Sequence, residues 1–301
     1  MRRPFEALAT MCGTGEGDVL RLIEESRAKR LVRRFGGVFD TRRLGYKSAL
    51  CCADVPNGEI DAAAAKITPL AAVTHCYMRR AENIAAPALW FTLSEGNGRF
   101  DELADHVRNL LRPWNFEILF ALKRYKIDVI FPESSRIADE KTEFSCDADE
   151  PSVLSAEERS IVARLCGDTI VQADYFAQFG DAENTLETVR SLHKRGILKR
   201  IALLLAHRNA GWVANGMCCW RMDGDTVAAG RALAACAEVS HAYERVLTPI
   251  FPFNLFAMVH AKTPAEAHEK FLRVQAASGL ENGVMLVSRK EYKKTSLSFW
   301  R

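Results

Sequence analysis

The sequence has no apolar run near the roughly 18 residues that a membrane span needs, and none follows the N-terminal Met-Arg-Arg-Pro-Phe-Glu segment. It also has little net charge, since 41 Lys and Arg residues stand against 38 Asp and Glu residues. We therefore predict no signal peptide, no membrane association and a cytoplasmic location. A net charge of +3 neither requires nor excludes an anionic partner.

Metal-binding cysteine motifs are also missing. Nine cysteines are present, but no two are spaced as Cys-x-x-Cys, which argues against a zinc or iron–sulfur site. Several of them lie within apolar, strand-like runs such as those around Cys51 and Cys218. We expect buried free thiols in a reducing cytoplasm, and no bound metal.

What the sequence does contain is an internal repeat. Displacing the chain by 166 residues superimposes identical residues without a gap from about residue 30 to 93. The identities include the pairs Arg34/Arg200, Arg42/Arg208, Gly45/Gly211, Cys52/Cys218, Val73/Val239 and Leu89/Leu255. At 301 residues the chain is long enough for two such copies, each with its own core. We expect the two copies to pair, because each sheet has a face to cover.

Each copy predicts a winged helix-turn-helix followed by a βαββαβ domain. In the second copy, Ser155 caps a helix to Cys166, further helices cover 173–179 and 182–194, and an extended hairpin covers 197–207. Next come strand 211–221, helix 226–236, strands 238–245 and 253–261, helix 264–278 and strand 283–287; an extended piece at 291–299 would add an edge strand. The fold class is α+β, with two tandem units of a winged helix-turn-helix plus a ferredoxin-like domain.

The predicted domain boundaries follow from this pattern and from composition. They are 1–45 for a partial winged helix-turn-helix, 46–131 for a ferredoxin-like domain, 132–152 for an acidic linker, 153–210 for a complete winged helix-turn-helix and 211–301 for a second ferredoxin-like domain. The first copy is partial because Met1 falls on Gly167, so the leading helix of the second copy has no counterpart.

A helix-turn-helix raises the hypothesis of a DNA-binding regulator. Its recognition helix should offer Arg, Lys, Asn or Gln to base edges and phosphates. Here both candidate helices begin with acidic residues, in Gly-Glu-Gly-Asp from Gly15 and Asp-Ala-Glu-Asn from Asp181. Carboxylates suit a helix N-terminus but repel phosphates, so DNA binding is disfavoured.

One predicted strand carries chemistry in both copies. It reads His-x-Tyr-x-Arg, with His75, Tyr77 and Arg79 in the first copy and His241, Tyr243 and Arg245 in the second. Strand side chains alternate between faces, so each trio shares one face. An exposed sheet face with ordinary polar residues is the alternative, although such a face more often carries Lys, Glu and Thr.

A second polar cluster stands at the junction of the wing and the sheet in the second copy. It comprises His207, Arg208, Trp212 and Asn215, and its alternative interpretation is a polar hairpin end. Arginine forks bind carboxylates, aromatic rings pack on flat faces, and histidine donates protons near neutral pH or ligates metal. Together these residues suit a large, flat, polycarboxylated anion.

In these stretches the sequence resembles the Lrp/AsnC-like sirohaem decarboxylases of alternative haem and haem d1 biosynthesis. The resembling segments are Val32–Val38, Leu44–Lys47, Val73–Tyr77 and Leu89–Leu93, and then His207–Met217, Val239–Arg245 and Pro252–Phe256. The family usually pairs two non-identical subunits, so the resemblance implies that both subunit types are fused in this chain.

The resemblance implies a carbon–carbon lyase that removes CO2 from the C12 and C18 acetates of sirohaem and forms 12,18-didecarboxysirohaem. His241, His75 and Tyr243 would be catalytic. Substrate would be bound by Arg245, Arg208, His207, Trp212, Asn215, Arg79, Tyr77 and Asn254. No cofactor is expected because the iron tetrapyrrole is the substrate, although His241 or His207 would be placed to contact its iron.

Two alternatives stay open at this point. One is a ligand-responsive DNA-binding regulator of the Lrp/AsnC type, and the other is a tetrapyrrole-binding protein without turnover. The loop after Arg79 has fewer polar and aromatic anchors than residues 248–254, which favours the second half as the productive one. Oligomeric assembly beyond the pairing of the two halves is open as well.

Overall fold

The computed structural model describes residues 2–81, 84–96, 98–127, 144–145, 150–206, 209 and 211–300. The first half contains α1 (Pro4–Cys12), α2 (Glu16–Ala28), β1 (Val32–Phe39), β2 (Lys47–Asp54), α3 (Ile60–Ile67), β3 (Val73–Ala81), β4 (Leu89–Glu95), α4 (Phe100–Leu110), β5 (Asn115–Leu119) and β6 (Ala121–Ile127). The short β7 (Phe144–Ser145) follows within the predicted linker, most of which lies outside the described residues.

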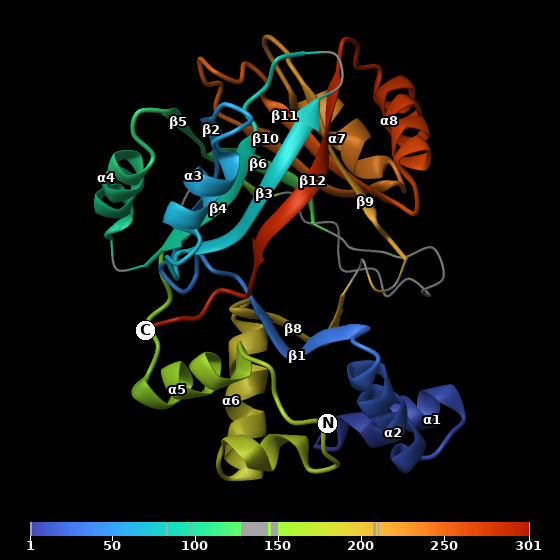
Figure 1. Ribbon diagram of the computed structural model, residues 1–301. Coiled ribbons are helices and arrows are strands. Elements are labelled where there is room, and N and C mark those ends of the chain that lie inside the picture. The colour runs from blue at the N-terminus through green and yellow to red at the C-terminus, as the bar shows by residue number, and fades with distance from the viewer. Residues whose placement is uncertain are drawn as a thin grey trace.

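The second half repeats this order with one more helix at its start. It contains α5 (Ala156–Leu165), the 3-10 helix η1 (Tyr175–Phe179), α6 (Ala182–Lys194), β8 (Leu198–Leu205), β9 (Ala214–Trp220), α7 (Val227–Ala235), β10 (Val239–Arg245), β11 (Leu255–Ala261), α8 (Pro264–Ser278) and β12 (Val284–Lys294). Both halves therefore run through a helix-turn-helix and then βαββαβ, which confirms the predicted fold class. In Figure 1 the large sheet and α3, α4, α7 and α8 form one layer, the helix-turn-helix segments form another, and β1 and β8 lie between them.

The predicted cap of α5 is confirmed. The Ser155 side chain accepts a hydrogen bond from the Glu158 backbone N–H, and the Glu158 carboxylate accepts one from the Ser155 N–H. This reciprocal arrangement satisfies two N–H groups that the first turn of the helix leaves without partners.

We expect Ser155→Ala to lower the free energy of unfolding by about 1 kcal/mol, because the Glu158 N–H loses its acceptor. Urea denaturation followed by circular dichroism measures the change. Ser160→Ala, within the same helix, is the matched control and should cost nothing, since alanine favours a helix interior. Equal midpoints for the wild type and Ser155→Ala would contradict the role of the cap.

The prediction of a wing hairpin within the second copy is wrong. In the structure β8 pairs antiparallel with β1 of the first copy, from Val32 opposite Leu205 to Phe39 opposite Leu198. Each copy contributes a single strand whose backbone groups need a partner, and the other copy's strand supplies it. The two wings thus form one shared two-stranded sheet.

The two βαββαβ units also share their main sheet, which has ten strands in the order β5-β2-β4-β3-β12-β9-β11-β10-β6-β7. The halves are joined because each ends in a strand that crosses to the other: β6 pairs with β10, and β12 pairs with β3. The predicted strand at 283–287 and the first part of the predicted strand at 291–299 are accordingly one strand, β12, which ends at Lys294. Its far end is not an edge, because it pairs with β3. Pairing of the two halves within one chain is thereby confirmed.

The register of this sheet corrects the ungapped repeat. Leu93 and Val259 are equivalent at an offset of 166, yet their partners Ala49 and Gly216 differ by 167. The copies have therefore slipped by one residue in β2 and β9. Because side chains alternate along a strand, a residue of β9 faces the same way as the residue of β2 that is 167 positions earlier, not 166.

Three apolar clusters fill the sheet region. One lies under α3 and α4, a second under α7 and α8, and the third joins the halves. The third contains the fully buried Trp90, whose ring meets Phe251 of the other half edge-on at 4.9 Å and whose indole N–H donates to the Pro87 carbonyl at 2.7 Å. The side chains of this third cluster define the inner face of the shared sheet.

Most of the described cysteines are buried free thiols, as predicted. Cys51, Cys52, Cys76, Cys166, Cys218 and Cys219 are buried, and Cys236 is half-buried. Cys12 is exposed, so the prediction is wrong there. Burial raises the pKa of Cys76 to about 12, and it raises the pKa of Cys51 as well, so these thiols stay protonated and unreactive.

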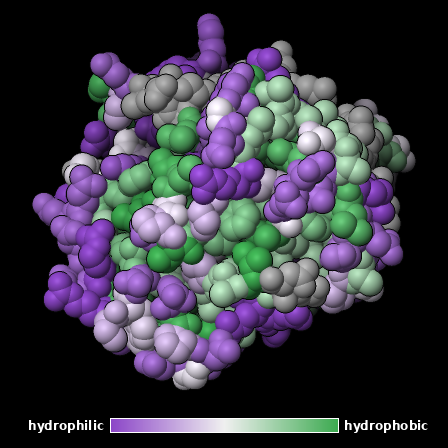
Figure 2. Space-filling model, turned by 90° about the horizontal axis from the view of Figure 1, so that it is seen from above, coloured by the Kyte–Doolittle hydropathy of each residue, from purple (hydrophilic) through white to green (hydrophobic). Residues whose placement is uncertain are grey.

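Within the described ranges, no helix combines the length and the apolar character that crossing a membrane would take. Seen from above, apolar residues gather near the middle of the surface and polar residues surround them (Figure 2). A groove of about 600 Å³ lies beside the end of β3, lined mostly by small and apolar residues of 55–56, 84–88 and Ile250.

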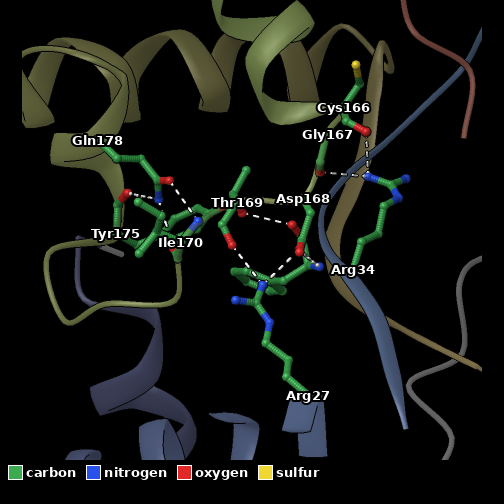
Figure 3. Close-up of polar contacts among 10 residues, drawn as sticks. Arg27, Arg34, Cys166, Gly167, Asp168, Thr169, Ile170, Tyr175 and Gln178 are labelled. Atoms are coloured by element: carbon green, nitrogen blue, oxygen red, sulfur yellow. Dashed lines mark hydrogen bonds and ion pairs between the residues drawn. The ribbon is translucent and has the colours of Figure 1, made fainter. Parts of the chain in front are cut away.

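The two helix-turn-helix segments are locked to each other (Figure 3). Arg27 at the end of α2 forms an ion pair with Asp168 at 2.7 Å and donates to the Thr169 carbonyl at 2.8 Å. Arg34 of β1 donates to the Cys166 carbonyl at 2.7 Å, and Phe35 packs against Tyr175. One of the cations that a DNA-binding helix would offer to phosphates is thus used inside the protein.

Candidate active site

The first His-x-Tyr-x-Arg strand is β3, and its three side chains lie on the inner face. His75 pairs with Thr92 and Tyr77 with Trp90 of the joining cluster, so the strand register directs them inward. The rings of His75 and Tyr77 stack with centroids 6.3 Å apart, and the Arg79 guanidinium lies 5.3 Å from the Tyr77 ring centroid. The shared face predicted from the period of two is confirmed for this strand.

Arg79 is the unusual member of the trio. It is only 7% exposed, and its Nε and Nη1 atoms make no hydrogen bond to any of the described residues. Burial lowers the pKa of this guanidinium, which nevertheless keeps its charge. A buried cation is costly unless an anion accompanies it, so this position suits an anionic ligand.

The second strand, β10, repeats the arrangement with a different outcome. His241 Nδ1 lies 2.9 Å from Ser240 Oγ, and the Arg245 guanidinium lies 4.8 Å from the Tyr243 ring centroid. Unlike Arg79, however, Arg245 donates from Nη1 to the Leu119 backbone carbonyl at 2.9 Å. The two trios share a strand pattern but differ in how the arginine is bound.

His75 is neutral in this structure. Burial, assisted by Arg33, Lys294 and Arg79, lowers its pKa from the ordinary 6.5 to about 4. Its Nδ1 lies 3.0 Å from Thr74 Oγ1. Carboxylates of a bound ligand would offset these cations and raise the pKa of His75 toward the range in which it donates a proton.

This shift predicts a pH-dependent stability. The unfolded chain takes up a proton at His75 near pH 6.5, whereas the folded chain does so only near pH 4, so the folded state loses stability as pH falls through that interval. We expect the wild type to lose more free energy of unfolding than His75→Gln between pH 7 and pH 4.5, approximate limits set by this interval. Urea denaturation at both values measures it, and His106→Gln at the exposed His106 is the control. Parallel losses in the wild type and His75→Gln would refute the assignment.

The second predicted cluster is only partly visible. His207 and Arg208 lie outside the described residues. Trp212 packs beneath the ammonium groups of Lys270 at 5.0 Å and Lys262 at 5.8 Å. Asn215 lies on β9 with its Oδ1 buried and unbonded among the described residues.

Asn254 is placed apart from these residues. It is 7% exposed, donates from Nδ2 to the Met222 carbonyl at 2.8 Å and accepts from the Met222 N–H at 2.9 Å. Its amide is used to hold the chain after β9 against the start of β11, which leaves both amide atoms engaged within the protein.

Two further inner-face residues were not singled out from the sequence. His260 on β11 pairs with Asn215, and Ser288 on β12 pairs with Arg79. The period of two along Phe256, Met258 and His260 was a signal for the first. Ser288 could not be found from sequence, because its partner belongs to the other half of the chain.

Comparisons with known proteins agree with this geometry. The AsnC-like ligand binding domain matches residues 43–126 and 209–293. A siroheme decarboxylase of Hydrogenobacter thermophilus is 30% identical over all of this chain and 90% of its own length. A siroheme decarboxylase beta subunit of Methanosarcina barkeri is 34% identical over 38% of this chain and 76% of its own length.

Solved structures give the same result. The crystal structure of the siroheme decarboxylase NirDL matches all of this chain and 90% of its own, with a TM-score of 0.74 and 26% identity. A second crystal structure of that protein, in complex with an iron-uroporphyrin III analogue, matches 99% of this chain and 89% of its own, with a TM-score of 0.72 and 26% identity.

Proposed function

Because this chain belongs to the siroheme decarboxylase family, we propose that it removes CO2 from the C12 and C18 acetate side chains of sirohaem and releases 12,18-didecarboxysirohaem. It is then an enzyme of the carbon–carbon lyase class, with an iron tetrapyrrole as substrate. Fusion of two subunit types in one chain accounts for its paired halves and for its partial match to a single beta subunit.

The observation that carries this proposal is the state of Arg79. A guanidinium that is buried, charged and without a carboxylate partner among the described residues is placed to receive one from a ligand. Sirohaem is rich in carboxylates, and each would form short, charge-assisted hydrogen bonds with an arginine fork. The stacked rings of His75 and Tyr77 beside it offer a flat apolar surface to the macrocycle.

The reaction balances with a proton alone. The bond between the acetate methylene and its carboxylate breaks, CO2 leaves, and the electron pair stays on the methylene carbon. Protonation of the macrocycle lets that electron pair be delocalised into the ring, a second proton transfer at the methylene yields the methyl group, and the macrocycle then releases the proton that it took up. Per acetate, one proton is consumed, and no oxidant or added cofactor enters the balance.

We assign the proton transfers to His241 and His75. Both are imidazoles on the inner face, and each has Nδ1 near a hydroxyl that orients its ring. Tyr77 and Tyr243 would line the flat face, while Arg79, with Arg208, would hold carboxylates. Contact of His241 or His207 with the substrate iron belongs to the same proposal.

Anaerobic incubation of the purified chain with sirohaem, followed by mass spectrometry, tests the function. Loss of two CO2 masses is the expected result. A changed visible spectrum with an unchanged mass would mean binding without turnover and would overturn the proposal. A tight, salt-sensitive complex with DNA and no change in sirohaem would favour the regulator instead.

A further inference from the structure

A row of polar side chains crosses the seam between the two halves on the inner face. His260 of β11 lies opposite Asn215 of β9, and Ser288 of β12 lies opposite Arg79 of β3. The two pairs adjoin, because Met217 pairs with Leu286 and the next inner-face residues beyond that pair are Asn215 and Ser288. The row therefore runs His260, Asn215, Ser288, Arg79 over four neighbouring strands.

This row has unused hydrogen-bonding capacity inside the protein. Asn215 Oδ1, Ser288 Oγ and the Arg79 atoms Nε and Nη1 are all buried, and none has a hydrogen-bond partner in the part of the chain that the structure describes. Buried polar atoms are nearly always satisfied, so three adjacent residues with unmet atoms indicate a place for ligand atoms. The Arg79 guanidinium fork and the Ser288 hydroxyl beside it can donate to a carboxylate side chain, whereas Asn215 can donate only through its amide NH2 group, because Oδ1 is an acceptor.

The pseudo-symmetric row in the other half has its polar side chains engaged within the protein; we call it the closed row, and the row through Arg79 the open row. Ser94 pairs with Ser48 where His260 pairs with Asn215, and Ala121 pairs with Arg245 where Ser288 pairs with Arg79. The Ser48 and Ser94 hydroxyls hydrogen-bond each other at 2.8 Å, and Arg245 donates to the Leu119 carbonyl. Ala121 has only a methyl group where the other row has the Ser288 hydroxyl, and the two serines satisfy each other, so the neighbours of Arg245 offer no matching polar set to a ligand.

We propose that His260, Asn215, Ser288 and Arg79 form one composite subsite that holds a carboxylate side chain of the substrate, and that the Ser94–Ser48–Ala121–Arg245 row does not. The subsite takes Arg79 from the first half and its other members from the second half. It rests on the proposed function only for the identity of the substrate. Binding at one row and not at its counterpart fixes the orientation of the tetrapyrrole in the chain.

The test converts the open row into the closed one. The variant His260→Ser/Asn215→Ser/Ser288→Ala copies the residues of the other half, and Ser288→Ala alone is the smallest change. Since a hydrogen bond to a charged group is lost or weakened at each position, we expect the triple variant to bind sirohaem about 10- to 100-fold more weakly and Ser288→Ala about tenfold more weakly. The measurement is an anaerobic absorbance titration with sirohaem.

Turnover separates this role from a structural one. The KM should rise with the dissociation constant while kcat changes less, because the contact holds the substrate in the ground state as well. Ser48→Ala/Ser94→Ala in the closed row is the control and should leave affinity and turnover unchanged. Equal thermal midpoints for wild type and Ser288→Ala show that the variant is folded.

Sirohaem affinity in Ser288→Ala and the folded triple variant equal to wild type would overturn the subsite, even with decarboxylation intact. If instead the wild type binds sirohaem without releasing CO2, the proposed function fails while the titration still decides the subsite. Weakened binding in Ser48→Ala/Ser94→Ala to the same extent as in the triple variant would also overturn it, because both rows would then hold substrate.

Discussion

Replacing Arg79 with glutamine is expected to lower kcat/KM for sirohaem decarboxylation by about 10²- to 10⁴-fold, because two charge-assisted hydrogen bonds to a carboxylate are lost. The same change removes a buried cation that no described side chain neutralises, so the variant should unfold at the same temperature as wild type or above it. Steady-state kinetics under anaerobic conditions and thermal unfolding measure the two effects. Lower activity without lower stability is what a binding residue predicts and a structural residue does not.

Two controls bracket this result. Arg79→Lys keeps the charge but not the fork, and it should recover a minor part of the activity. Arg80→Gln, one residue on and facing away from the inner face, should leave turnover unchanged. A kcat/KM of Arg79→Gln within about twofold of wild type would refute the binding role of Arg79, because such a ratio corresponds to a very small difference in activation free energy.

Replacing His241 with alanine is expected to lower kcat by about 10²- to 10⁴-fold, the range that a positioned general acid contributes. His241 lies on the inner face of β10, and the Nδ1 contact to Ser240 Oγ orients its ring. Single-turnover measurement of CO2 release at saturating sirohaem isolates this step from binding. His268→Ala, at an exposed position on α8, is the control and should release CO2 at the wild-type rate.

His75→Ala provides the comparison between halves. Loss of one CO2 in one variant and of the other CO2 in the other would assign each histidine to one acetate. Full release of both by His241→Ala would remove this residue from the catalytic assignment. Full release of both CO2 molecules by His75→Ala would likewise remove His75 from the catalytic assignment.

Much of this protein was predictable because its information is local. The His-x-Tyr-x-Arg spacing shows that three side chains share a face, since the period of a strand is two residues wherever the strand lies. The Ser155-Ala-Glu-Glu158 cap, the helix α8 and the βαββαβ order likewise depend on neighbours in sequence. The repeat then carried these predictions from one half to the other.

Two predictions that were wrong, the wing hairpin and the ungapped repeat, depend on contacts between distant parts of the chain. Whether β8 folds back on its own copy or pairs with β1 depends on which free strand edge is nearest in space, and the sequence of β8 is the same in both cases. The one-residue slip between β2 and β9 left most of the repeat's identities in place. Because side chains alternate along a strand, however, residues of β2 and β9 that match at the repeat's offset point to opposite faces of the sheet.

The sequence alone thus determined the two copies, their element order and the two His-x-Tyr-x-Arg trios, because each follows from periodicity and composition along the chain. Only the tertiary structure decided that Arg79 lies opposite Ser288 of the other half, with Asn215 on the strand beyond it, while Arg245 donates to a backbone carbonyl. The reason is that strand exchange sets the neighbours of each trio, and identical trios acquire different chemistry when β12 and β6 bring different residues beside them.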